Sequence, residues 1–220
     1  MNIFDVLGPV MVGPSSSHTA GAVRIGLMTR RLLGEQPSLA RILMYGSFAA
    51  TGKGHGTDRA LVAGLLGMYP DDMGIPESLD RAEEEGMAVE FGEAKIKDAH
   101  PNSVILEVKG ASGCELQVQA SSLGGGRIMV NKLDGIDVNC TCEMPTLIVH
   151  NLDQPGHVAE VASMLSHKSV NIANMRLYRN RRGGAAVMVL ETDQDIPEES
   201  IRWLEHLEGV TKVTYINVDE

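Results

Sequence analysis

The spacing of apolar residues predicts a long helix near the start of the chain, over residues 20–33. Side chains that suit one face of a helix recur there every three or four positions, at Ala22, Ile25, Met28 or Thr29, Leu32 and Leu33. Gly34 follows directly, and glycine is the residue that most often ends a helix. We therefore expect a helix that stops at Gly34.

The rest of the N-terminal part predicts shorter elements, with helices first and strands afterwards. We expect a strand or turn over residues 3–7, a strand over 41–48, a loop over 52–56, helices from 57 and over 76–85, and strands near 89 and over 104–109, 115–121 and 127–132. Helices that come first and antiparallel strands that come later indicate an α+β fold.

The C-terminal part predicts a regular order of strands and helices. Strands are expected over 147–150, 172–178, 185–190 and 210–218, with helices around 158–165 and 197–207. The resulting order, β-α-β-β-α-β, is that of a ferredoxin-like unit. Because the pattern changes at Glu143-Met144-Pro145, we expect two domains, over residues 1–144 and 145–220.

Composition and charge narrow the class of protein. The 220 residues are 43% hydrophobic and 22% charged, which fits one or two globular domains. A formal net charge of −10 argues against nucleic acid or an anionic membrane as the main partner. We expect a cytoplasmic protein, because the sequence shows no signal peptide, no membrane-spanning apolar run and no Cys-x-x-Cys. Cys140 and Cys142 could hold a metal, but two free thiols fit their spacing better.

The run from Gly13 to Thr19 carries the most chemistry. Four hydroxyls flank His18 directly before the predicted helix, those of Ser15, Ser16, Ser17 and Thr19. A helix N-terminus favours an anion, because its first N–H groups are free and the helix dipole is positive there. A histidine beside the anion can move a proton. One hydroxyl is enough to cap a helix, so this run indicates a binding site as well as a cap.

A second run, Thr51 to Asp58, contains three glycines together with Lys53, His55, Thr57 and Asp58. It does not match a P-loop, because Gly54 stands where that motif requires Ser or Thr. Alone it would be a flexible turn with a Thr or Asp cap. Beside the first run, it predicts a shared pocket in which two helix N-termini bind a small carboxylate and a histidine removes a proton from it.

Two further stretches carry weaker signals. His100-Pro101-Asn102 has the composition of a turn before a strand, and Ser122-Leu123-Gly124-Gly125-Gly126 that of a break between strands. The other histidines lie on or beside regular elements of the C-terminal part. We expect them in surface or packing roles.

These four motifs, in this order, resemble the β portion of the iron–sulfur L-serine dehydratases, and the segment from Asn151 to Gly156 resembles part of an ACT domain. Together the resemblances cover essentially the whole chain. They imply the β subunit of a two-chain enzyme that deaminates L-serine to pyruvate and ammonia without pyridoxal phosphate. In that family three cysteines of the α portion hold a [4Fe–4S] cluster. The cysteines of this chain do not show that pattern, so the resemblance implies a separate α chain as partner and no activity without it.

The resemblance also suggests a role for each motif. His55 is expected to remove the Cα proton of serine, while His18 and the neighbouring hydroxyls orient the carboxylate and relay protons. Lys53, Thr57 and Asp58 are expected to position the second loop at the substrate. His100 and Asn102 are expected at the same site or on a segment near it.

For the C-terminal part, the resemblance implies an effector loop and a pairing surface. The effector loop contains Asn151, Asp153 and Gly156, and two ACT domains are expected to pair side by side. The N-terminal domain also resembles the serine-sensing domain of some phosphoglycerate dehydrogenases. The rival interpretation is therefore a regulator that binds serine without turning it over.

Overall fold

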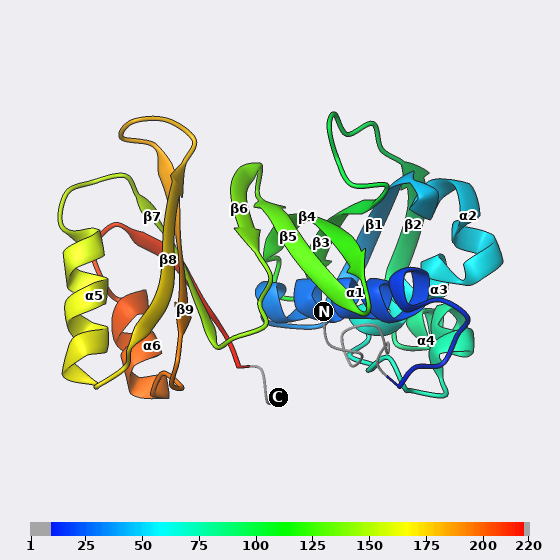
Figure 1. Ribbon diagram of the computed structural model, residues 1–220, viewed down its shortest axis with the longest axis horizontal. Coiled ribbons are helices and arrows are strands. Elements are labelled where there is room, and N and C mark those ends of the chain that lie inside the picture. The colour runs from blue at the N-terminus through cyan, green and yellow to red at the C-terminus, as the bar shows by residue number, and fades with distance from the viewer. Residues whose placement is uncertain (1–9, 218–220) are drawn as a thin grey trace. The chain divides into compact units, whose positions relative to one another are not determined.

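The computed structural model describes residues 10–217 (Figure 1), so the strand or turn expected over residues 3–7 lies outside the described part. The chain divides into two units, between Asp134 and Gly135. Both units combine helices with a largely antiparallel sheet, which confirms the α+β class.

The division falls before the boundary that the sequence suggested at residues 143–145. Residues 136–140 form strand β6 (Ile136–Cys140), in which buried and exposed positions alternate. This strand contacts β8 and β9 of the second unit. The composition change at Pro145 coincides with the start of the next strand, β7 (Thr146–Leu152).

Along the sequence, the first unit has helices before and after β1, and then a run of strands. Its elements are a π-helical turn (Ser16–Ala20), α1 (Gly21–Leu33), β1 (Pro37–Gly46), α2 (Ser47–His55), α3 (Thr57–Leu65), a 3₁₀ turn (Ile75–Glu77), α4 (Ser78–Glu84), β2 (Ala88–Glu93), β3 (Asn102–Gly110), β4 (Glu115–Gly124) and β5 (Arg127–Leu133). The predicted helix ends as expected, at Gly34 in the left-handed conformation. The helix expected over 76–85 is divided between the 3₁₀ turn and α4.

The strands of the first unit pair in the order β2-β1-β3-β4-β5. The β1–β2 pair is parallel and the others are antiparallel, with Ile42 opposite Leu106 and Leu106 opposite Val118. Helix α1 packs against β3, β4 and β5 (Figure 1). The helix that carries the first motif is therefore fixed to the middle of the sheet.

Helices α1 and α3 touch backbone to backbone. A Cβ added to Gly64 would lie 2.6 Å from the amide nitrogen of Leu27 and 2.9 Å from Cα of Gly26, and closer still to the carbonyl oxygen of Val23. Only glycine leaves room for this approach. The contact fixes the start of α3 relative to the start of α1, and these are the two ends that carry the first and second motifs.

The second unit has the predicted β-α-β-β-α-β order after β6. Its elements are β7 (Thr146–Leu152), α5 (His157–His167), β8 (Ile172–Arg179), β9 (Ala185–Thr192), α6 (Glu198–Glu205) and β10 (Val210–Ile216). The strands lie in the order β10-β7-β9-β8, and all pairs are antiparallel. A core that includes Leu147, Leu165, Met188 and Leu204 joins the sheet to both helices. Within residues 10–217, no helix is long and apolar enough to cross a membrane.

Candidate active site

The first motif forms a cap and a wide helical turn. Ser15 is extended (φ −141°, ψ 123°), and its Oγ accepts a hydrogen bond from the backbone N–H of His18 at 3.2 Å. The residues that follow, Ser16–Ala20, form a π-helical turn that leads into α1. Ser15 is thus the helix cap that the sequence predicted, and one hydroxyl of the run is used in this way.

The ring of His18 is held by hydroxyls on both of its nitrogens. Nδ1 lies 3.1 Å from Oγ of Ser17 and 3.4 Å from Oγ of Ser15. Nε2 lies 3.1 Å from Oγ of Ser47. Sequence reasoning missed Ser47, which stands between the motifs at the junction of β1 and α2. A serine directly after the strand-ending Gly46 was the only local signal for it.

His18 is buried, with 8% of its surface exposed. Burial lowers the pKa of His18, since a charged ring loses its hydration there, and the charge of nearby His55 lowers the pKa further. A backbone hydrogen bond involving Ser47 acts in the opposite direction and is the smallest of the three effects. His18 is therefore neutral at pH 7, so that one ring nitrogen donates and the other accepts.

His55 brings the second motif to the first. It is the last residue of α2, and its ring centroid lies 5.0 Å from that of His18, with the two planes at 75°. On α2, the ring of Phe48 also stands edge-on to His18, at 5.3 Å and 65°. Unlike His18, His55 is exposed. One histidine is thus enclosed by hydroxyls and the other is open to solvent beside it.

The second motif differs from the loop that the sequence predicted. Residues 52–55 continue α2, and the helix ends only at Gly56, which is left-handed with φ +66°. Thr57 does not cap α3. It is the first helical residue, fully buried, and its Oγ1 has no hydrogen-bond partner in the described structure. Three glycines suggested a loop, but those at 52 and 54 have helical neighbours on both sides and only the third breaks the helix.

A cavity of about 510 Å³ opens between the two motifs. Thr19 lines it from the first motif, and His55, Asp58 and Arg59 line it from the second. The Oγ1 of Thr19 is buried without a partner among residues 10–217, and Oδ1 of Asp58 accepts the backbone N–H of Arg59 at 2.9 Å. Arg59 was not predicted as a site residue. It supplies a cation at the N-terminal turn of α3, where an anion is already favoured.

The other predicted residues of the first two motifs lie outside this lining. His18 contacts His55, Ser15 and Ser17 contact His18, and none of these three residues borders the cavity. Ser16 belongs to the π-helical turn and is half-buried. Lys53 lies within α2, and its side chain is outside the described part of the structure. Residues of both motifs therefore line one cavity, but the hydroxyls of the first motif contact mainly the buried histidine.

The third motif supports the site through its backbone. The carbonyl oxygen of Pro101 accepts the backbone N–H of Ser47 at 2.8 Å, and Gly46 pairs with Asn102 across β1 and β3. Gly46 has φ +59°, and a Cβ there would lie 2.5 Å from the same carbonyl oxygen. His100 is exposed, and its Nδ1 accepts the N–H of Asn102 at 3.2 Å. The segment therefore positions Ser47, and none of its side chains borders the cavity.

The fourth motif packs against the start of α1. A Cβ on Gly21 would lie 2.8 Å from Cβ of Ser122 and closer still to its Oγ. That Oγ is buried and has no partner in the described part of the chain. Ser122 thus fixes the end of the first motif from the side of the sheet.

In the second unit, the segment from Asn151 to Gly156 is tied to its neighbours. Asn151 is buried and its side chain donates to the carbonyl oxygen of Leu152 at 2.7 Å. Oδ2 of Asp153 accepts the backbone N–H of Gly183 at 2.9 Å and pairs with Arg179 at 2.7 Å. The backbone N–H of Gly183 has the larger effect and Arg179 the next, and together they lower the pKa of Asp153. Gly156 has φ +109° and precedes α5.

The cysteines do not form a metal site with other residues. Sγ of Cys140 lies 3.0 Å from Sγ of Cys142, both side chains are buried, and Cys114 is half-buried elsewhere. The hydrogen bond between the pair lowers the pKa of Cys140 and raises that of Cys142. In the described ranges no three side chains of His, Cys, Asp or Glu gather as metal ligands would. Cys140 and Cys142 thus lie side by side, and Cys114 lies apart from them.

Comparison with known proteins connects this site to one family. The family "Serine dehydratase beta chain" matches residues 2–133. Over 98% of the chain and 97% of each relative, the sequence is 39% identical to "Probable L-serine dehydratase, beta chain" of Bacillus subtilis and 35% identical to "L-serine dehydratase, beta chain" of Peptoniphilus asaccharolyticus.

Two more distant similarities cover only part of the chain. A D-3-phosphoglycerate dehydrogenase of Methanocaldococcus jannaschii is 33% identical over 98 residues, which are 42% of this chain and 19% of that protein. A solved homoserine dehydrogenase from Thiobacillus denitrificans aligns with 52% of this chain and 33% of its own at 16% identity, with a TM-score of 0.26. That score is too low to assign a fold.

Proposed function

This chain belongs to the serine dehydratase beta chain family, and from that premise we propose that it is the β subunit of an L-serine ammonia-lyase. With an α subunit, it would convert L-serine to pyruvate and ammonia. The observation that carries the proposal is the pair of histidines at the cavity: His55 open to a ligand, and His18 neutral and buried behind it.

In this proposal, His55 is the base that removes the Cα proton of serine. It borders the cavity, whereas both nitrogens of His18 are already bonded to hydroxyls. When His55 takes up the proton, its charge meets a neutral ring whose own protonation is disfavoured. The proton therefore stays on His55 or leaves through solvent, and His18 with Ser15, Ser17 and Ser47 holds its orientation.

The substrate carboxylate would lie at the N-terminus of α3. Arg59 offers a planar fork of donors that suits a carboxylate, and the unpartnered hydroxyl of Thr19 offers one more. Asp58 uses one carboxylate oxygen on the N–H of Arg59, which leaves the other oxygen for the ammonium group of serine. This arrangement presents the Cα–H bond to His55.

The residues of this chain do not fit a [4Fe–4S] cluster. Such clusters need several cysteine thiolates, whereas Cys140 and Cys142 are buried against each other in the second unit and Cys114 lies apart. We therefore assign the cluster and its ligands to the α subunit, and the activation of the leaving hydroxyl to groups outside this chain.

The second unit is proposed to be an ACT domain that senses an amino acid, with L-serine as the first candidate, and that pairs with a second copy. Its β-α-β-β-α-β order supports this assignment. So do buried polar atoms without hydrogen-bond partners in the described structure, Oδ1 of Asn151 and the ring nitrogens of His157, of which Nδ1 lies 3.5 Å from the carboxylate of Glu160. They lie at the two ends of the loop that precedes α5. A ligand at this loop would give them partners.

The test is to co-express this chain with an α subunit without oxygen and to measure pyruvate formed from L-serine. His55→Gln should lower kcat by about 10²- to 10⁴-fold, the usual contribution of a general base. Near-normal turnover of this variant would remove His55 from the reaction.

A second pair of variants tests the carboxylate assignment. Arg59→Gln should raise KM roughly tenfold to a hundredfold, as expected for a charge-assisted hydrogen bond, and Arg59→Lys should recover part of the loss. The matched control is Arg41→Gln, which removes an exposed arginine of the same unit that pairs with Glu107 away from the cavity. Equal KM values for the two Gln variants would contradict the assignment.

The similarity to a phosphoglycerate dehydrogenase favours one rival, a serine-binding regulator without catalysis. Calorimetry with L-serine distinguishes the two. Serine binding to the assembled complex, with an intact cluster but no pyruvate, would support the regulator.

A further inference from the structure

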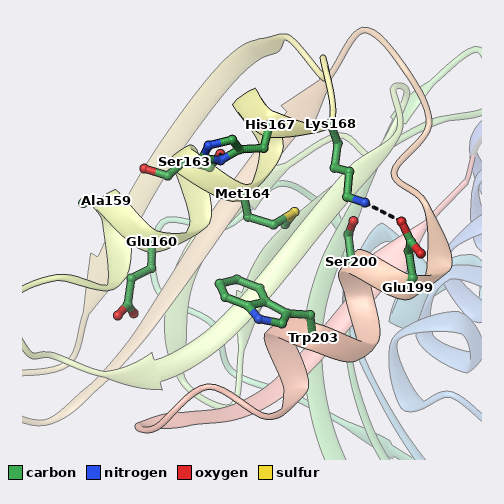
Figure 2. A pocket seen from close by; sticks show the side chains of 9 residues that line it. All are labelled: Ala159, Glu160, Ser163, Met164, His167, Lys168, Glu199, Ser200 and Trp203. Atoms are coloured by element: carbon green, nitrogen blue, oxygen red, sulfur yellow. Dashed lines mark hydrogen bonds and ion pairs between the residues drawn. The ribbon is translucent and has the colours of Figure 1, made fainter.

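A cavity of about 650 Å³ lies between α5 and α6 in the second unit (Figure 2). Its volume is within the range of roughly 300–1,000 Å³ that small-molecule sites occupy. It is separate from the candidate active site, which lies in the first unit, and from the segment Asn151–Gly156, no residue of which lines it. The cavity therefore has no role in the function proposed above.

One side of the cavity is apolar. Met164 of α5 and Trp203 of α6 extend toward it (Figure 2). The neighbour of Trp203, Leu204, is fully buried in the core of the unit, so the helix turns Trp203 outward and leaves 47% of it exposed. An exposed indole offers a large contact surface to a flat or branched apolar group.

The other side of the cavity is polar and carries both a cation, Lys168, and an anion, Glu199. Lys168 pairs with Glu199, which uses one of the three N–H donors of its ammonium group. Beside this pair, Ser200 is only 2% exposed, and its Oγ has no partner among the described residues. Ser200 lies in the first turn of α6, the end of a helix that favours a negative charge. A buried hydroxyl without a partner is costly, and a ligand oxygen would remove that cost.

We propose that this cavity binds a small carboxylate that carries an aromatic or branched aliphatic group. The carboxylate contacts Lys168 and Ser200, and the apolar group covers Trp203 and Met164. L-Serine lacks the apolar group, and a neutral apolar molecule lacks the anion. Simple acids and amino acids can both carry the carboxylate and the apolar group. Amino acids carry an ammonium group in addition, which would meet Glu160 on the rim of the cavity.

Trp203 makes the site directly measurable, because it is the only tryptophan of the chain. The full chain is titrated with 3-phenylpropionate, 4-methylpentanoate and L-phenylalanine while tryptophan emission is recorded. At least one should give a saturable change with a Kd on the order of 0.1 to 1 mM, as expected for ligands of this size. Benzyl alcohol and L-serine should give none. Whichever of 3-phenylpropionate and L-phenylalanine has the lower Kd shows whether the cavity prefers a simple acid or an amino acid.

Two substitutions on α5 form a matched pair. Ser163 lines the cavity and Ser166, on the same helix, does not, and both are exposed. Ser163→Phe should fill the cavity and abolish the emission change, while Ser166→Phe should leave it intact. Lys168→Gln should weaken binding at least tenfold and Ser200→Ala severalfold, with Trp203 kept as the reporter in both.

The proposal is overturned if no acid gives a saturable change, or if binding survives Ser163→Phe. It is also overturned if benzyl alcohol binds as tightly as 3-phenylpropionate, since the site would then not recognise a carboxylate. Should Ser163→Phe fail to fold, Lys168→Gln decides, and unchanged affinity in that variant rejects the site. None of these results depends on activity with an α subunit.

Discussion

Replacing Gly64 by alanine should destabilise the first unit, although alanine is the better helix former. A Cβ at this position would lie 2.6–2.9 Å from backbone atoms of Leu27 and Gly26, so α1 and α3 must move apart by roughly 1 Å to reach ordinary contact. Overpacking of this kind costs about 3 kcal/mol. The higher helix propensity of alanine offsets about 1 kcal/mol of this cost, so the net loss of folding stability is about 2 kcal/mol.

The control is Gly54→Ala, in α2. Gly54 is also helical, but a Cβ there has nothing within 4 Å. That variant should gain up to about 1 kcal/mol from helix propensity alone. The two substitutions therefore make the same chemical change with opposite expected signs.

Thermal unfolding followed by circular dichroism measures the difference. Gly64→Ala should lower Tm by roughly 4–8 °C, and Gly54→Ala should leave it unchanged or raise it slightly. Gly26→Ala would add a Cβ at the same contact between α1 and α3. The double variant with Gly64→Ala should therefore lose less stability than the sum of the two single losses. A Tm for Gly64→Ala at or above that of Gly54→Ala would refute the backbone contact between α1 and α3.

Three further predictions concern single positions. The pKa of His18 is lowered from an ordinary 6.5. The neutral ring therefore contributes stability above pH 6.5, and this stability is lost as the pH falls through the pKa of His18 in the folded state. Tm of the wild type should drop more steeply from about pH 7 to 5 than Tm of His18→Gln. The pKa of Asp153 is also lowered, from 3.8, so the Tm gap between wild type and Arg179→Met should be full at about pH 6 and narrow as the pH falls below about 4. Gly46→Ala should cost about 1–3 kcal/mol, because a positive φ and a close carbonyl act together; Gly113→Ala, with φ +89° and open space, should cost less in the same urea titration.

The sequence predicted the features that depend on local pattern. The helix that ends at Gly34 and the β-α-β-β-α-β order follow from residue spacing and from glycine, and both are present. The meeting of His18 and His55 was also expected, because each belongs to a run rich in hydroxyls or glycines beside a helix end. The structure brings their rings to 5.0 Å.

The features that depend on distant contacts could not be predicted in this way. Ser47 reaches His18 because β1 ends at Gly46 and the chain is held there by Pro101, which is more than fifty positions away. Helical continuation through Gly52 and Gly54 opposes the intrinsic preference of glycine, and the contacts of α2 as a whole with α3, β1 and β3 override it. Arg59 looked like an ordinary surface residue of a helix until the cavity between the two motifs was visible.

The hydroxyls around His18 have different partners, and this difference is the strongest argument for the roles of the two histidines. Ser15 caps the helix, Ser17 and Ser47 bond opposite nitrogens of the buried ring, and the hydroxyl of Thr19 is left to the cavity. A base must have a free nitrogen that faces the substrate, and both nitrogens of His18 are occupied. These contacts support the proposal that the hydroxyl run positions His18 and that His55, which lines the cavity at the end of α2, is the base.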